Sequence, residues 1–165
     1  MLTLRTWAVG LALLLAGAVP ALAQDLTVVL VRHAEKVDDS RDPALSEAGH
    51  RRAEALADIL ADAGVSAIYT TQFQRTVQTA APLAQRLGVA AQVVPASGGT
   101  HAADVAARVR EHREGTVVVV GHSNTVPDII ATLGGPVLTI GDDEYDHLFI
   151  LRLTADGVRI IRARY

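Results

Sequence analysis

Two apolar runs, each of which ends at a histidine, constrain this chain more than any other feature. Residues 26–31 (LTVVLV) precede Arg32 and His33, and residues 117–120 (VVVV) lead through a glycine to His122. Neither run alternates regularly between apolar and polar residues, which is typical of strands buried on both faces of a parallel sheet. In open α/β sheets, ligands bind outside the carboxyl ends of the strands. The two histidines are therefore expected to meet at one candidate ligand site.

The rest of the chain alternates strand and helix patterns. Ser46 is a suitable N-cap for one helix, Gly88 is expected to close another in the left-handed conformation, and Pro127 fits the first turn of a third. This alternation implies right-handed crossovers and a three-layer α/β/α fold with a mainly parallel central sheet. The predicted strands are 26–31, 65–69, 89–94 and 117–120, the predicted helices end near 63, 87, 114 and 133, and 147–153 with 157–163 is the predicted terminal hairpin.

An apolar stretch opens the chain after Arg5 and closes with Ala21-Leu22-Ala23. Small residues at 21 and 23 match a signal-peptidase site, and the stretch is short for a membrane span. We expect residues 1–23 to be a cleaved secretory signal and residues 24–165 to form one domain, exported to the periplasm or secreted, without stable membrane insertion. An uncleaved N-terminal anchor is the alternative.

The charge balance is slightly acidic. The full chain has 15 basic and 18 acidic residues, a net charge of −3, and no cysteine. Loss of Arg5 with the signal would leave 14 basic residues against 18 acidic ones, a net charge of −4. This balance argues against nucleic acid as a general partner, so any anion-binding site is expected to be a local pocket. Without disulfides, the fold must depend on its apolar core.

Four residues at strand-to-helix junctions suggest phosphate chemistry: Arg32, His33, Arg75 and His122. Two guanidinium groups can hold phosphate oxygens in bidentate geometry. Nearby cations lower the pKa of a histidine, which keeps the imidazole neutral and able to attack phosphorus. The second histidine can donate hydrogen bonds to the phosphate oxygens in the transition state.

Three segments resemble the signatures of the histidine phosphatase superfamily, also called the phosphoglycerate mutase-like family. They are residues 31–36 (VRHAEK), 70–76 (TTQFQRT) and 121–124 (GHSN). The resemblance covers nearly all of residues 24–165 and implies the phosphoglycerate mutase-like fold. It further implies that His33 is the nucleophile, that Arg32, Arg75 and His122 complete the phosphate pocket, and that no metal or other cofactor is used.

The chain departs from this family pattern at two points. Ala34 stands where the family usually has glycine. The general acid is also not evident: one branch of the family places it directly after the second histidine, where this chain has Ser123. The other branch takes it from the preceding interval, where Asp104 is best placed, although a first-turn helix acid favoured by the dipole is an equal interpretation. Glu35 is the next candidate and could also reach the substrate.

Further residues are expected at the rim of the pocket. Lys36 lies where some relatives carry another phosphate-binding basic residue, and Ser123 with Asn124 begins a helix whose free amide groups favour an anion. These three are predicted to bind substrate, and His101 is a weaker candidate. The acidic run 142–146 fits no calcium-loop spacing and is interpreted as a solvated turn.

The resulting hypothesis is an exported, metal-independent phosphatase that transfers a phosphoryl group to His33 and then hydrolyses the phosphohistidine. Its substrate would be a small-molecule or envelope phosphate ester, with mutase activity less favoured. Phosphohistidine proteins would suit an enzyme with a poor acid, but they are mainly cytoplasmic. The alternative from another class is a non-catalytic phosphate-binding or envelope interaction protein that retains the pocket. The sequence leaves the oligomeric state open.

Overall fold

The computed structural model describes residues 25–165. The predicted signal peptide, residues 1–23, lies outside the described residues, as does Gln24. No helix within the described part of the chain is both long and apolar enough to cross a membrane.

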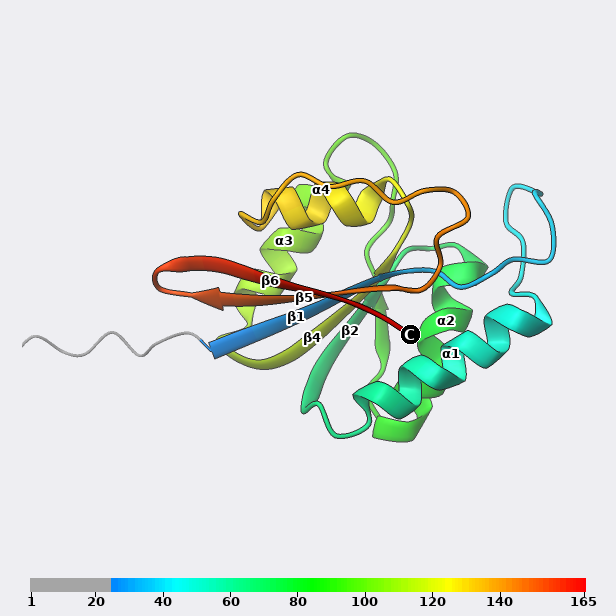
Figure 1. Cartoon of the computed structure of the whole chain (residues 1–165), viewed down its shortest axis with the longest axis horizontal. Helices are drawn as coiled ribbons and strands as arrows, with labels where there is room; N and C mark the ends of the chain where they lie inside the picture. Colours follow the sequence, from blue (N-terminus) through cyan, green and yellow to red (C-terminus); the bar gives the residue numbers. More distant parts are fainter. Residues whose placement is uncertain (1–24) are drawn as a thin grey trace, which may run out of the picture.

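One six-stranded sheet forms the centre of the molecule, with strand order β3-β2-β4-β1-β5-β6 (Figure 1). The first four strands in this order pair in parallel, and β5 and β6 pair antiparallel. The predicted mainly parallel sheet with a terminal hairpin is therefore confirmed. The strands are β1 (Asp25–Arg32), β2 (Val65–Thr70), β3 (Ala91–Val93), β4 (Glu114–Gly121), β5 (His147–Thr154) and β6 (Gly157–Arg164).

Two helices cover each face of this sheet, which gives the predicted three layers (Figure 1). Alternate valines of the two central strands pack against opposite pairs of helices: Val29 and Val118 on the α1–α2 side, and Val28 and Val117 on the α3–α4 side. Because both faces of these strands are buried, their sequences do not alternate between apolar and polar residues. The helices are α1 (Glu47–Leu60), α2 (Gln74–Leu87), α3 (His101–Glu111) and α4 (Thr125–Thr132).

The residues predicted to cap or begin helices do so in the structure. The Ser46 hydroxyl caps α1 by accepting a hydrogen bond from the Gly49 amide, and Gly88 ends α2 with φ +65°. Pro127 lies in the first turn of α4. Four elements are shorter than predicted. The helix α1 ends at Leu60, α3 ends at Glu111 before β4 begins at Glu114, α4 begins after Asn124, and β3 is only a short edge strand.

The pairing of β1 with β4 positions the two histidines. The strands run in parallel register as far as Arg32 opposite Gly121. The His33 amide then donates to the Gly121 carbonyl (2.9 Å), which extends the pairing one residue beyond the strand. Both histidines therefore emerge at the same point of the sheet edge.

Candidate active site

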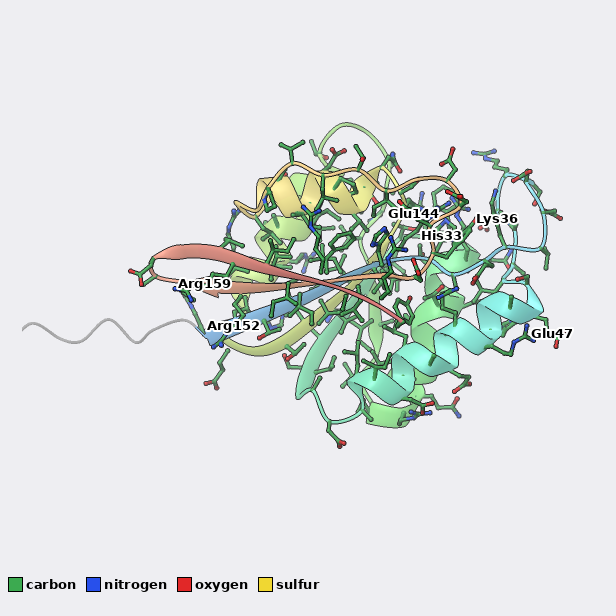
Figure 2. The ribbon with its side chains drawn as sticks, in the orientation of Figure 1. His33, Lys36, Glu47, Glu144, Arg152 and Arg159 are labelled. Carbon is green, nitrogen blue, oxygen red and sulfur yellow. The ribbon has the colours of Figure 1, made fainter. Side chains whose placement is uncertain are left out.

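A cavity of about 400 Å³ lies at the carboxyl ends of β1, β2 and β4. Figure 2 shows His33 at this end of the molecule together with Lys36, whereas Arg152 and Arg159 lie toward the far end of the β5–β6 hairpin. All four residues of the predicted phosphate pocket line the cavity: Arg32, His33, Arg75 and His122.

His33 has its ring fixed by its own backbone neighbour. Its Nδ1 lies 2.8 Å from the Ala34 carbonyl oxygen. Because a carbonyl only accepts, Nδ1 must carry the proton, and the lone pair is on Nε2. The side chain is buried, and this burial, together with the neighbouring Arg32 and Arg75, lowers the pKa of His33 to about 4 despite the hydrogen bond to Ala34. His33 is thus a neutral imidazole at ordinary pH with a free Nε2, as a nucleophile requires.

His122 is held at an edge-to-face angle to His33, with 5.3 Å between the ring centroids. Its Nε2 lies 3.1 Å from the Thr71 hydroxyl, which in turn lies 2.9 Å from the Thr76 hydroxyl. Nδ1 is therefore the ring nitrogen that remains for a ligand. Burial and the positive charge of Arg75 lower the pKa of His122 to about 3. The ring is neutral above this pH, and the two threonines fix its position.

Arg32 is almost completely buried and is bound by a loop more than a hundred residues away in the chain. Its Nη1 donates to the backbone carbonyls of Gly141 (2.7 Å), Asp142 (2.9 Å) and Glu144 (3.2 Å). The guanidinium carbon also lies 4.1 Å from the centre of the Tyr145 ring. Its Nε is buried without a hydrogen-bond partner in the described part of the protein. These contacts fix the guanidinium at the cavity wall.

Arg75 reaches the cavity from the first turn of α2. Its guanidinium carbon lies 4.4 Å from the Phe73 ring centre, and its Nη1 lies 3.9 Å from the Asp42 carboxylate. That carboxylate also accepts a hydrogen bond from the Gln74 amide at the start of the helix (2.8 Å). Arg75 therefore keeps most of its hydrogen-bonding capacity for an anion, because 3.9 Å allows attraction to Asp42 but no hydrogen bond.

The residues that flank the two histidines fit the site closely. The Ala34 methyl group packs in a small apolar cluster, and its amide donates to the Thr79 hydroxyl (2.9 Å). No described residue other than glycine has a positive φ, so alanine at this position causes no backbone strain. At Gly121, by contrast, a Cβ atom would lie 2.8 Å from the Thr125 hydroxyl. This close approach requires glycine.

Comparison with known families matches residues 28–101 to the histidine phosphatase superfamily (branch 1). This segment contains Arg32, His33 and Arg75, and the fold brings His122 to them from β4. Over residues 28–101 the chain is therefore similar to the histidine phosphatase superfamily.

Several solved structures have a similar fold over most of their length. Mycobacterial glucosyl-3-phosphoglycerate phosphatase Rv2419c is 18% identical, with a TM-score of 0.63 over 87% of this chain and 98% of that one. The protein histidine phosphatase SixA, in complex with tungstate, is 19% identical, with a TM-score of 0.67 over 84% and 96%. Phosphoserine phosphatase from Entamoeba histolytica is 14% identical, with a TM-score of 0.63 over 84% and 95%. At these identities the likeness concerns the fold.

A protein of Mycobacterium tuberculosis, PE-PGRS family protein PE_PGRS11, is 38% identical over 88 residues. The match covers 48% of this chain and 15% of that protein. This chain therefore spans only a small part of the length of this relative.

Three of the predicted substrate-binding residues line the cavity: Lys36, Ser123 and Asn124. The Lys36 ammonium pairs with the exposed Asp39 carboxylate. His101 lies instead beside a smaller neighbouring cavity of about 190 Å³, where its Nδ1 contacts the Pro95 carbonyl (3.1 Å). These two cavities share Asn124 and two further residues.

The two predicted acids, Asp104 and Glu35, are not among the residues that line the cavity. The Asp104 carboxylate accepts a hydrogen bond from the Thr100 hydroxyl (2.9 Å) in the first turn of α3 and borders a different cavity. Glu35 accepts three hydrogen bonds from Arg52, between 2.7 and 3.0 Å. Burial alone would raise the pKa of Glu35, but these bonds lower it, so Glu35 stays ionised. The structure thus places both carboxylates in structural pairs away from the cavity.

The loop at residues 141–146 is the part of the site that sequence reasoning missed. Its backbone binds Arg32, and the Tyr145 ring lies 6.0 Å from the His33 ring. Figure 2 shows Glu144 of this loop on the same side of the molecule as His33. The interpretation as a solvated turn is wrong for the carbonyl groups and for Tyr145. No motif in the sequence marks this loop.

The side chains at the site also indicate whether it suits a metal ion or an anion. Within residues 25–165, no group of three or more histidine or acidic side chains has an arrangement that could hold a metal ion. The cavity wall is instead rich in guanidinium and imidazole groups, which suit an anion.

Proposed function

We propose that this protein is a metal-independent phosphatase that hydrolyses a phosphate monoester through a phosphohistidine on His33. The observation that carries the proposal is the state of His33: a buried, neutral imidazole whose Nε2 lone pair is free, in a cavity shared with two arginines. The match of residues 28–101 to the histidine phosphatase superfamily and the phosphatases among the structural neighbours support it.

Each side chain of the pocket has a distinct part in this reaction. Arg32 and Arg75 bind the phosphate oxygens and neutralise their charge, which allows the His33 lone pair to approach phosphorus. As the P–N bond forms, His33 becomes positively charged, and the Ala34 carbonyl stabilises this charge through Nδ1. His122 contacts the phosphate oxygens from the opposite side, where it stabilises the charge that develops on them.

The substrate in this proposal is a small-molecule or envelope phosphate ester. Lys36 and Arg41 also line the cavity and add two positive charges beyond those of the phosphate pocket. Such a rim favours an anionic substrate through steering and local attraction. An exported location, in the periplasm or outside the cell, follows from the signal-like residues 1–23 and is part of the same proposal.

Replacement of His33 by alanine tests the proposal. Turnover of 4-nitrophenyl phosphate by His33→Ala should fall below about a hundredth of that of the wild type, the scale of losing a covalent catalyst. His50→Ala, at an exposed position on α1, is the matched control and should retain full turnover. Labelled phosphate from the substrate should be trapped on wild-type protein as an acid-labile adduct and be absent from His33→Ala. A wild-type protein that binds phosphate but releases none from the ester would instead be a phosphate-binding protein.

A further inference from the structure

We propose that Asp142 is the general acid that protonates the leaving group. The inference rests on the proposed phosphatase function. Among the residues that line the cavity in the described chain, Asp142 is the only one with a carboxyl group. A phosphate ester with a basic leaving group needs a proton donor within reach of the leaving oxygen. The cavity offers this one candidate.

The other carboxyl groups near the site are engaged elsewhere. Asp42 accepts from the Gln74 amide and faces Arg75. Glu144 accepts from the Gly141 amide (2.8 Å) and lies 3.1 Å from the His147 ring, and these bonds lower the pKa of Glu144 to about 2. Glu35 is held by Arg52. The partners of Glu144 and Glu35 lower the pKa of both carboxyl groups and keep them ionised, so neither can hold a proton for the leaving group.

Asp142 differs because its backbone is fixed while its side chain is exposed. Its carbonyl accepts a hydrogen bond from Arg32 Nη1 at 2.9 Å, which ties this residue to the guanidinium that would bind the phosphate. Its carboxyl group has no hydrogen bond or ion pair among the contacts of residues 25–165. Asp142 therefore lines the cavity, its backbone is anchored to the guanidinium that would bind the phosphate, and its carboxyl group is free to turn toward a leaving oxygen.

In the proposed reaction, Asp142 gives up one proton and regains one proton in each turnover. The P–O bond of the ester breaks as His33 Nε2 forms its bond to phosphorus, and the leaving oxygen takes the Asp142 proton. The resulting carboxylate then accepts a proton from the water that attacks phosphorus. As the P–N bond breaks, Nε2 recovers its electron pair, inorganic phosphate forms, and Asp142 is protonated again.

The test compares leaving groups in the intact protein. A 4-nitrophenolate leaves without protonation, whereas an alkoxide such as that of glycerol 2-phosphate needs the acid. Asp142→Asn should slow alkyl phosphate hydrolysis by about 100-fold or more and change aryl phosphate turnover by less than about fivefold. Asp143→Asn removes the same charge from the same loop at a residue outside the cavity lining and should leave both rates near the wild-type values. Asp104→Asn should do the same.

Four results would overturn the assignment. Equal slowing of both substrates by Asp142→Asn would indicate a binding or structural role, and no slowing of either would leave Asp142 without a role. Selective loss of alkyl turnover in Asp104→Asn would transfer the role to Asp104. A wild-type enzyme that hydrolyses aryl but no alkyl phosphates has no working acid. In each case aryl turnover and the trapped phosphohistidine persist in the wild type, so the proposed function stands. Their absence would refute the proposed function itself.

Discussion

Acidification should destabilise this fold, with His33 as a principal cause. The ring is 4% exposed and has a pKa of about 4 in the folded protein, compared with 6.5 for an ordinary histidine. Between these two values the unfolded chain binds a proton that the folded protein does not. The free energy of unfolding therefore contains a contribution from His33 that is fully present above pH 6.5 and is lost as the pH falls toward 4.

The size of this contribution follows from the two pKa values. A tenfold change in proton affinity is worth about 1.4 kcal/mol, so the lowered pKa of His33 corresponds to ~3 kcal/mol between pH 7 and pH 4. His33→Asn removes the titrating ring and keeps an amide donor near the Ala34 carbonyl. The loss of unfolding free energy between pH 7 and pH 4 should be ~3 kcal/mol smaller in this variant than in the wild type.

Urea unfolding at several pH values between 4 and 7 measures the difference. The buffers should contain no phosphate or sulfate, because an anion bound in the cavity would stabilise the folded state. His50→Asn, which replaces an exposed histidine, should follow the wild-type curve. Parallel curves for His33→Asn and the wild type would refute the argument, since they would mean that the His33 ring has the same pKa in the folded protein as in the unfolded chain.

Three further expectations concern the site and its supports. Vanadate should inhibit competitively and a chelator should leave aryl phosphate turnover unchanged; loss of activity with the chelator, restored by a divalent ion, would contradict this expectation. Thr71→Val removes the hydroxyl beside His122 Nε2 and should lower kcat about tenfold with little change in KM, together with ~1 kcal/mol of stability lost in thermal unfolding. Gly49→Ala would place a Cβ atom 2.1 Å from the Glu35 carbonyl oxygen, so it should cost ~2 kcal/mol or more, and an unchanged Tm would count against it.

The central part of the fold was predictable because its signals are local. Valine runs that lack alternation predict strands covered on both faces, and the two clusters around Val29 and Val28 show this covering directly. The meeting of His33 with His122 followed from one general rule, that the carboxyl ends of parallel strands share one edge of the sheet. The short strand β3 was predicted less well, because an edge strand is limited by its single neighbour rather than by its own residues.

The proposed general acid, Asp142, could not be predicted from the sequence, because its place at the site depends on contacts between distant segments of the chain. Asp104 lies within the expected interval of the sequence, but its position on α3 directs it to Thr100 and a different cavity. Asp142 comes from a loop with no recognisable motif, and the hydrogen bond that brings it to the site joins residues 110 positions apart. Sequence spacing carries no information about such a contact.

In the proposed site, Arg32 links the bound phosphate to the conformation of the loop at residues 141–146. The same guanidinium donates to three loop carbonyls, stacks on Tyr145, and lines the cavity with its buried Nε unpartnered among the described residues. A planar group with five donors can bind the loop with one nitrogen and an anion with the others, whereas a lysine ammonium has a single donor centre for both tasks. Any change that frees the loop would thus also displace the arginine that we propose to bind phosphate. The loop that supplies Asp142 is therefore coupled to phosphate binding.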